Sequence, residues 1–215
     1  NRGIKPVVGD NVEFTVLDET ALEGNIDKIL PRKNVLIRPA SANVDQALVV
    51  FAITQPDPNF NLLDRFLIMM LAQDIPVTIC FNKTDLENGE KQEEYRNIYE
   101  QAGYPVMFVS TYEKSGVEAV RDYLRGKTTI LAGPSGVGKS SLTNLLQPEA
   151  AMETGSISEK IKRGKHTTRH AELFCVEEDT YIMDTPGFSS LYLEEIEPQQ
   201  LKDYFPEFEA YEAEC

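Results

Sequence analysis

Short apolar runs alternate with segments of helical period from about residue 45 to residue 185. Six apolar runs predict strands: ALVVFAI (47–53), PVTICF (76–81), VMFVS (106–110), TTILAG (128–133), ELFCV (172–176) and TYIMD (180–184). Helical spacing predicts helices between or after them, at 62–73, 92–103, 116–126 and 139–147. Strands that are apolar throughout and linked by helices are typical of a mainly parallel sheet covered on both faces. The pattern therefore predicts an α/β domain with a mainly parallel six-stranded sheet.

The first 44 residues have a different pattern. Short strands broken by turns are predicted there, and no helical period of useful length interrupts them: 7–18, 24–31 and 34–39. Val12, Phe14 and Val16 alternate with polar residues, as expected of a half-buried strand. This pattern predicts an OB-like β-barrel over 1–44, and a first barrel strand would precede Asn1.

The predicted order is then this barrel, an α/β domain over 45–190 and an acidic helical segment over 191–215. The formal net charge of the chain is −14, which by itself argues against a nucleic-acid binder. The charge is uneven, because residues 172–215 contain thirteen Asp or Glu and one Lys, whereas residues 1–45 contain seven acidic and six basic groups. The acidic end is interpreted either as a solvated helical surface or as an interaction tail.

Composition disfavours membrane and disulfide-rich classes. No apolar run approaches the roughly 18 residues of a membrane span, and no signal-peptide pattern opens the chain. The cysteines, Cys80, Cys175 and Cys215, are odd in number and far apart, which argues against a disulfide framework and for a reducing cytosol. We therefore expect a cytoplasmic protein that does not bind membranes.

A phosphate-binding motif follows the fourth predicted strand. Residues 133–140, GPSGVGKS, fit G-x-x-x-x-G-K-[ST], with the strand before and the helix after that this motif requires. Its backbone N–H groups would surround the β-phosphate at the positive end of a helix dipole. Lys139 would span the β- and γ-phosphates, and the Ser140 hydroxyl would ligate Mg²⁺. The predicted phosphate-binding residues are Gly133, Pro134, Ser135, Gly136, Val137, Gly138, Lys139, Ser140 and Ser141.

The sixth predicted strand ends in a second nucleotide motif. Residues 184–187, DTPG, fit D-x-x-G. Asp184 would hold Mg²⁺ through a water molecule, and the Gly187 N–H would sense the γ-phosphate. A four-residue match is weak evidence by itself. The phosphate loop before it and its position at the end of a strand make a nucleotide-binding role more specific.

A guanine-reading motif ends the second predicted strand. Residues 82–85, NKTD, fit N-K-x-D. Asp85 would accept hydrogen bonds from guanine N1–H and the 2-amino group, while Asn82 would help read the opposite base edge and Lys83 would cover the ring. Adenine would leave the Asp85 carboxylate partly unpaired, at a cost of roughly 1.5–3 kcal/mol or more. Thr84 and Ser110, the latter from VST after the next strand, complete the predicted GTP-binding residues.

The order of these motifs is unusual. An ordinary GTPase has its phosphate loop before its guanine-reading motif, whereas here Gly133 follows Asn82. A binding site needs its loops close in space, and the carboxyl ends of parallel strands share one edge of a sheet. A GTPase domain whose termini were joined, and which was cut before residue 47, would have this order. The motifs therefore predict a circularly permuted P-loop GTPase domain that binds GTP and GDP with Mg²⁺.

The segment KRGKHTTRH (162–170) lies where the first switch of a GTPase is expected. Thr167 or Thr168 would reach Mg²⁺ when the γ-phosphate is present, with Thr168 taken as the predicted ligand. His166 and His170 are four residues apart and would form a metal-binding pair on a helix. The glycine and the Thr-Thr pair favour a loop instead.

The residue that follows D-x-x-G is unsuited to catalysis. Many GTPases place a Gln there to orient the attacking water, and Phe188 cannot take that role. His166 is the nearest suitable residue in the sequence, beside the alternative that this histidine has no catalytic role.

The ordered motifs NKTD, GPSGVGKSS, RGKHTTRH and DTPGF, with VGDNVEF and IRPASANVDQALVVFA, resemble the circularly permuted GTPases of the small-ribosomal-subunit biogenesis family (RsgA- or YjeQ-like). The resemblance spans essentially the whole chain. It implies a bacterial cytosolic GTPase that binds the 30S subunit and 16S rRNA, acts late in subunit maturation and is stimulated by the subunit. It also implies that His166 is catalytic. Lys139, which the phosphate-loop motif places at the β- and γ-phosphates, is the second catalytic residue that we expect. We expect a monomer.

The chain departs from that family at both ends. The first barrel strands seen in the family would precede Asn1. The family carries a zinc module, C-x-x-x-x-C-x-H-x-x-x-x-x-C, after F-P-E-F, and here FPEF occupies 205–208 while Cys215 stands at the first ligand position. A structural zinc site needs four ligands. Zn²⁺ is therefore expected in a full-length family member, and Cys215 alone is not expected to hold it.

Two other functions are compatible with the sequence. In the first, the protein is a GTP-gated RNA-binding switch whose hydrolysis is incidental, because Phe188 marks a poor catalyst. In the second, it is a permuted GTPase that serves the large ribosomal subunit. Stimulation by ribosomal subunits distinguishes the first from an enzyme, and co-sedimentation with separated subunits distinguishes the second.

Overall fold

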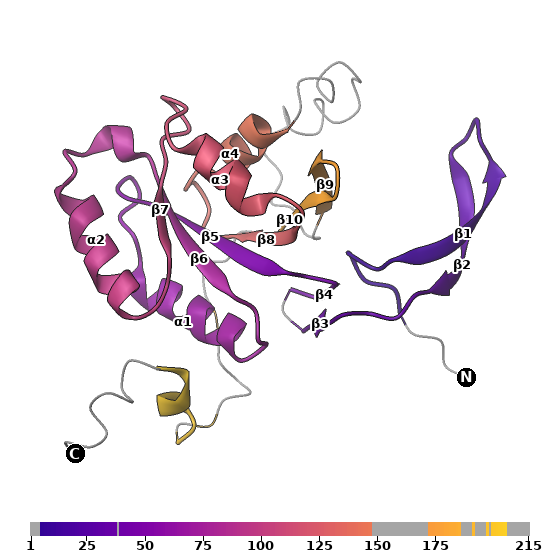
Figure 1. The fold of residues 1–215 in the computed structure, drawn as a ribbon, viewed down its shortest axis with the longest axis horizontal. Coiled ribbons are helices and arrows are strands. Elements are labelled where there is room, and N and C mark those ends of the chain that lie inside the picture. The colour runs from indigo at the N-terminus through magenta and orange to yellow at the C-terminus, as the bar shows by residue number, and fades with distance from the viewer. Residues whose placement is uncertain are drawn as a thin grey trace.

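A six-stranded sheet forms the centre of the protein. The computed structural model describes residues 5–37, 39–147, 172–185, 191, 197 and 199–205. The strand order is β7-β6-β5-β8-β10-β9 (Figure 1). The bounds are β5 (Gln46–Ala52), β6 (Val77–Asn82), β7 (Val106–Phe108), β8 (Thr128–Ala132), β9 (Glu172–Glu177) and β10 (Thr180–Asp184). All neighbouring pairs are parallel except β9 with β10, so the predicted mainly parallel sheet is confirmed.

Among the described residues, four α-helices cover the two faces of this sheet. They are α1 (Phe60–Leu71), α2 (Glu90–Gln101), α3 (Val117–Leu124) and α4 (Lys139–Leu146). Side chains of β5 divide between the faces, as the period of a strand requires. Val49 and Phe51 join the buried cluster that contains residues of α1 and α2, whereas Leu48 and Val50 join the one that contains residues of α3 and α4. Burial on both faces explains why this strand is apolar throughout its length.

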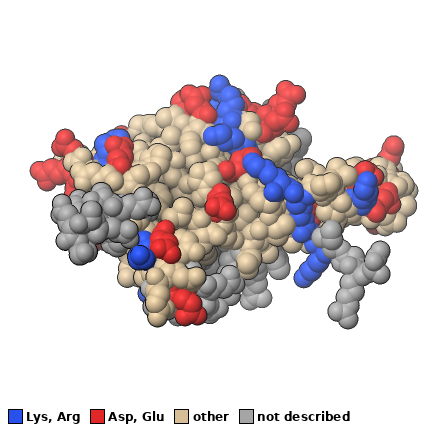
Figure 2. Space-filling view, turned by 60° about the horizontal axis from the view of Figure 1, so that its bottom comes forward, with Lys and Arg blue, Asp and Glu red and all other residues tan. Residues whose placement is uncertain are grey.

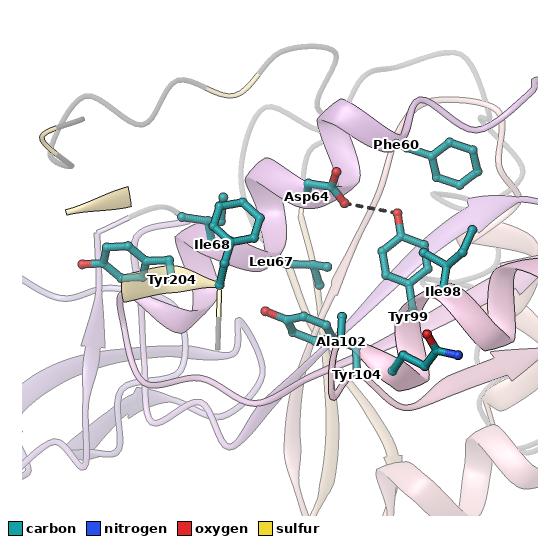
Figure 3. A pocket seen from close by; sticks show the side chains of 11 residues that line it. Phe60, Asp64, Leu67, Ile68, Ile98, Tyr99, Ala102, Tyr104 and Tyr204 are labelled. Atoms are coloured by element: carbon teal, nitrogen blue, oxygen red, sulfur yellow. Dashed lines mark hydrogen bonds between the residues drawn. The ribbon is translucent and has the colours of Figure 1, made fainter. Parts of the chain in front are cut away.

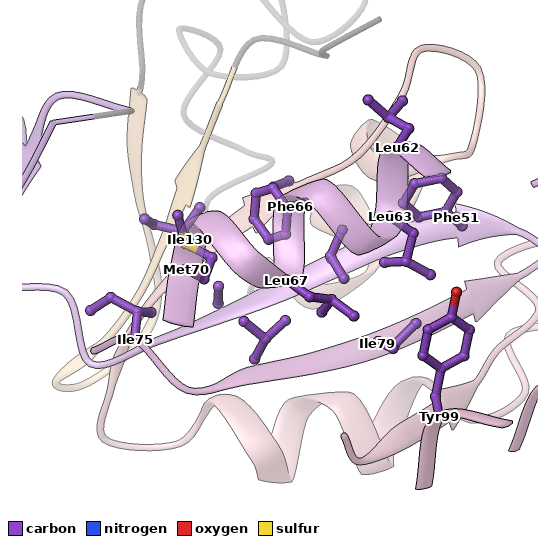
Figure 4. Close-up of a cluster of buried hydrophobic side chains, with 14 of the residues drawn as sticks. Phe51, Leu62, Leu63, Phe66, Leu67, Met70, Ile75, Ile79, Tyr99 and Ile130 are labelled. Carbon is purple, nitrogen blue, oxygen red and sulfur yellow. The ribbon is translucent and has the colours of Figure 1, made fainter. Parts of the chain in front are cut away.

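Helix α1 is held firmly against the sheet. It begins where the Asn59 side chain accepts a hydrogen bond from the Leu62 N–H at 3.1 Å, an N-cap that places the start two residues before the predicted one. Its side chains Leu63, Phe66 and Met70 face the sheet and are buried (Figure 4). Burial of each such side chain contributes about 1.5–3 kcal/mol. Helix α1 is therefore a fixed support for whatever its outer face holds.

The N-terminal residues form an arm that extends away from the sheet (Figure 1). Strands β1 (Val12–Asp18) and β2 (Glu23–Ile29) pair antiparallel, and the short strands β3 (Val35–Leu36) and β4 (Ser41–Ala42) form a second pair. Phe14 and Val16 are 62% and 51% exposed, so the prediction of a half-buried strand is wrong for the described residues. A two-stranded ribbon has no second layer to cover its apolar face. The OB-like barrel over 1–44 stays a prediction.

One ion pair stabilises the arm itself, and a second joins the arm to the sheet domain. Arg32 donates to both carboxylate oxygens of Asp10, at 2.6 and 2.8 Å, and this hydrogen-bonded guanidinium lowers the pKa of Asp10. Lys33 pairs with Asp45, whose other carboxylate oxygen accepts from the Thr128 N–H at 2.8 Å. The arm is thus connected to the first residue of β8, the strand that leads into the phosphate loop.

Charged side chains of both signs lie on the face shown in Figure 2, and basic side chains gather where the arm meets the sheet domain. The predicted acidic helical segment over 191–215 is described only in part. Its described residues include one short 3₁₀ helix, η2 (Leu201–Tyr204). Within the described part of the chain, no helix has the length and apolar character needed to cross a membrane.

Candidate nucleotide-binding site

The predicted motifs meet at one edge of the sheet. Parallel strands end there in neighbouring positions, since Ala52 at the end of β5 is paired with Asn82 at the end of β6, and Asp184 at the end of β10 is paired with Leu131 in β8. The guanine motif follows β6, and the phosphate loop follows β8. Strand β5 lies between them. Ligands of open parallel sheets bind at this edge, so the fold brings together loops that are far apart in the sequence.

The phosphate loop leaves β8 at Gly133, where only glycine fits. Its φ is +147°, and a Cβ there would lie 2.1 Å from the backbone oxygen of Val50. Lys139 begins α4 and donates to the carbonyl oxygens of Gly133 and Pro134, at 2.7 and 2.8 Å. Burial lowers the pKa of Lys139, and the negative charge of Asp184 opposes that shift. The Lys139 side chain thus bends back toward its own loop, and its ammonium group lies where the phosphates are expected.

Asn82 connects the guanine motif to two other loops. Its side-chain nitrogen donates to the Val137 carbonyl at 2.9 Å and to Thr111 Oγ1 at 3.2 Å. Its side-chain oxygen accepts from the N–H groups of Lys83 and Thr111, at 2.8 and 3.0 Å. These bonds use both donors and both acceptor sites of the carboxamide, which is fully buried. In this structure Asn82 therefore holds the base loops and the phosphate loop together, and its role at a base edge stays a prediction.

The side chain of Lys83 lies across the same junction. Its backbone is left-handed, with φ of 68°, and its Nζ donates to the Gly136 carbonyl at 2.8 Å and to the Gln55 carbonyl. Gln55 belongs to the loop that follows β5. The Lys83 side chain therefore connects its own loop with the loops that contain Gln55 and Gly136, and its role of covering the guanine ring stays a prediction.

Asp85 and Ser110 form the base-reading side of the site. The Ser110 hydroxyl donates to Asp85 Oδ1 and accepts from the Glu113 N–H at 3.0 Å. Ser110 is fully buried, whereas Asp85 is half-buried. The Thr84 N–H donates to the Val109 carbonyl at 3.2 Å, which fixes the motif to the end of the neighbouring strand. The Asp85 carboxylate is thus oriented through Oδ1 and retains acceptor capacity for a ligand.

Asp184 has the properties of a magnesium-binding carboxylate. Its Oδ1 is buried and has no hydrogen-bond partner among the described residues. Burial raises the pKa of Asp184, and the charge of Lys139 opposes that shift. A buried carboxylate oxygen without a partner is costly unless a cation or donor satisfies it. Ser140, exposed at the start of α4, offers the hydroxyl oxygen that such a site needs, so these residues fit Mg²⁺.

Comparison with known proteins decides the family. The chain matches the family described as RsgA GTPase over residues 29–194. It belongs to that family. The chain is 59% identical over 212 residues to the small ribosomal subunit biogenesis GTPase RsgA of Agathobacter rectalis, which covers 99% of this chain and 70% of that protein. The protein of the same name from Alkaliphilus metalliredigens is 52% identical over 212 residues, which covers 99% and 73%.

Two solved structures resemble this fold. YjeQ from Thermotoga maritima is 35% identical with a TM-score of 0.74, over 96% of this chain and 70% of that chain. YloQ, described as a circularly permuted GTPase, is 36% identical with a TM-score of 0.72, over 100% of this chain and 68% of that chain. The permuted order that the motifs predict is confirmed.

Several predicted site residues lie outside the described residues. They are Thr167, Thr168, His166, His170, Gly187, Phe188 and Cys215. The described residues also include two that the motifs did not indicate. Thr111 bonds twice to Asn82, and Gln55 accepts from Lys83 through its backbone. Thr111 follows Ser110 directly and was within reach of sequence reasoning, whereas a backbone carbonyl leaves no signal in the residue type.

A large cavity elsewhere in the protein is separate from this site. It has a volume of about 690 Å³ and lies between α1 and α2, where Asp64, Tyr99 and Tyr104 line it together with Tyr204 and Phe205 (Figure 3). The Tyr99 hydroxyl donates to Asp64 Oδ1 at 3.2 Å. None of its lining residues belongs to a nucleotide motif, so the size of this cavity does not make it the nucleotide site.

Proposed function

We propose that this chain is a Mg²⁺-dependent GTP hydrolase that acts in the maturation of the small ribosomal subunit. The observation that carries the proposal is the junction at Asn82, which joins a guanine-reading loop to a phosphate loop at one sheet edge. A phosphate loop alone would fit many nucleotides, and the N-K-x-D loop held beside it by Asn82 supports the choice of a guanine nucleotide. The relatives named small ribosomal subunit biogenesis GTPase support the biological role.

Different described residues would bind the base, the phosphates and the magnesium ion of GTP. Asp85 would accept from the guanine edge, and Lys139 would exchange its two loop carbonyls for phosphate oxygens. Ser140 and Asp184 would hold Mg²⁺, which supplies positive charge to the phosphates. Thr168 is the further ligand we propose, with Thr167 as its alternative, and the Gly187 N–H would sense the γ-phosphate.

Finer parts of the proposal concern partners and location. We expect contact with 16S rRNA, action late in subunit maturation, a monomeric state and a cytoplasmic location. Most of the net negative charge lies in residues 172–215, whereas acidic and basic residues nearly balance in residues 1–45. An rRNA contact is therefore expected to involve the N-terminal part and not the acidic end.

Ribosomal subunits provide the direct test of this function. Addition of purified small subunits is expected to raise GTP turnover by about tenfold or more, because the complete catalytic arrangement then lowers the barrier by about 1.4 kcal/mol per factor of ten. Phosphate release is measured with small subunits, with large subunits and with neither, and Lys139→Ala controls for contaminating activity. Unstimulated turnover would favour the GTP-gated RNA-binding switch. Stimulation and co-sedimentation with large subunits only would reassign the partner.

His166 is the proposed catalytic residue. Because it would position or activate water in the hydrolytic step, His166→Ala is expected to lower subunit-stimulated turnover by about 100-fold and to leave the affinity for GDP unchanged. Turnover is measured at saturating GTP, and GDP affinity by titration of a fluorescent analogue. His170→Ala is the matched control, since it changes the same residue type four positions away. Wild-type turnover in His166→Ala would remove the catalytic role.

A further inference from the structure

The chain that follows Asp184 is attached to the protein at two described points. The first is Thr185, which is buried. Its N–H and its hydroxyl both donate to the Leu131 carbonyl of β8, at 3.3 and 3.0 Å. This contact joins the start of the D-x-x-G motif to the strand that carries the phosphate loop.

The second point of attachment is Leu191 on helix α1. Arg65 Nη1 donates to the Leu191 carbonyl at 3.0 Å, and the Leu191 side chain packs against the main buried cluster. Arg65 stands in the middle of α1 and is half-buried. Leu63 and Phe66 fix α1 to the sheet. The Arg65 guanidinium therefore extends from a helix of fixed position and holds Leu191 there. A hydrogen bond from a charged donor is also stronger than one between neutral groups.

The connection between these two attachments is short. Five residues, 186–190, separate Thr185 from Leu191, and an extended chain of that length spans at most about 20 Å. Gly187, whose N–H is proposed to sense the γ-phosphate, is one of the five. Fixing both ends of a short connection reduces the number of conformations that it samples, and releasing one end increases that number.

We propose that Arg65 is a positioning residue for the γ-phosphate-dependent steps of the nucleotide cycle. It acts through Leu191, because it holds the chain where that chain leaves the D-x-x-G motif. The inference rests on the proposed function, since it requires that GTP and GDP be distinguished by this motif. Residues of α1 also face the chain further on, since Leu67 and Ile68 line one cavity together with Tyr204 and Phe205 (Figure 3). A purely structural role for Arg65 on this helix is therefore the alternative to be separated.

The test compares Arg65→Ala and Arg65→Lys with the wild-type protein. Affinities for GDP and for a non-hydrolysable GTP analogue are measured by titration, and turnover is measured with small subunits. Arg65→Ala is expected to lower affinity for the GTP analogue and stimulated kcat by about tenfold each, while affinity for GDP stays within about twofold. Arg65→Lys is expected to recover part of the loss, because an ammonium group still donates to a carbonyl.

The control and the contrary outcomes are defined by the same measurements. Arg125→Ala is the control, because the Arg125 side chain is 63% exposed and pairs with Asp122 and Glu177, away from residues 185–191; it should match wild type. An unchanged ratio of GTP-analogue to GDP affinity in Arg65→Ala overturns the inference, and so does an equal loss for both nucleotides. Absence of GTP hydrolysis in the wild type would instead overturn the proposed function.

Discussion

Asp85→Ala is expected to lower the affinity for GDP by about 100-fold or more and to remove the preference for GDP over ADP. The carboxylate would accept two hydrogen bonds from guanine, each worth about 1.5–3 kcal/mol because one partner is charged. Together these correspond to at least two factors of ten in affinity. The measurement is a titration with a fluorescent GDP analogue, followed by competition with GDP and with ADP.

Ser110→Ala is the matched control for this change. It keeps the carboxylate and removes the hydroxyl that donates to Asp85 Oδ1, so it affects only the orientation of the acceptor. We expect a loss of about tenfold or less in GDP affinity, with selectivity over ADP retained. If Asp85→Ala bound GDP as tightly as wild type, the guanine-reading role of the motif would be wrong.

Gly138→Ala is expected to have a comparable effect by a different route. A Cβ at Gly138 would lie 2.2 Å from Asn82 Nδ2, and its φ of +98° is unfavourable for any residue with a side chain. The backbone strain costs about 1–2 kcal/mol. Displacing the buried Asn82 amide leaves polar groups without partners, at about 1–3 kcal/mol for each. We therefore expect a loss of about 3 kcal/mol or more, measured as reduced GDP affinity and reduced stability in denaturant.

Gly136→Ala separates the clash from the strain. Gly136 lies in the same loop with φ of +80°, and no atom lies within 4 Å of the position that its Cβ would occupy. Its substitution is therefore expected to cost only the backbone term of about 1–2 kcal/mol. Equal effects of the two substitutions would show that the Asn82 junction does not control the geometry of the phosphate loop.

Much of the fold was predictable because its elements depend on local patterns. The strand over 47–53 is apolar at every position because both of its faces are covered, as Leu48 and Val49 in opposite clusters show. The N-terminal arm was less predictable. Alternation at Phe14 correctly predicts a strand, but whether its apolar face is covered depends on a second layer, and local sequence does not contain that information.

The candidate site divides in the same way. Asp85, Lys139 and Asp184 were predictable, because a motif specifies residue types at short spacing and each motif ends a strand. The contacts of Thr111 and Gln55 were not predictable, because they depend on which loops become neighbours through the strand order of the sheet. Residues 162–170 lie outside the described part of the chain, and their predicted roles stay predictions.

The sequence by itself determined the alternation of strands and helices, the nucleotide chemistry and the permuted order of the motifs, because these follow from residue types and from spacings of a few residues. Only the tertiary structure decided that Asn82 joins the phosphate loop to the base loops and that Arg65 holds Leu191. The bonded residues are separated by 55 and 126 positions in the chain. Both contacts end on backbone carbonyls, which every residue type carries, so only the path of the chain in space selects the ones that are bonded.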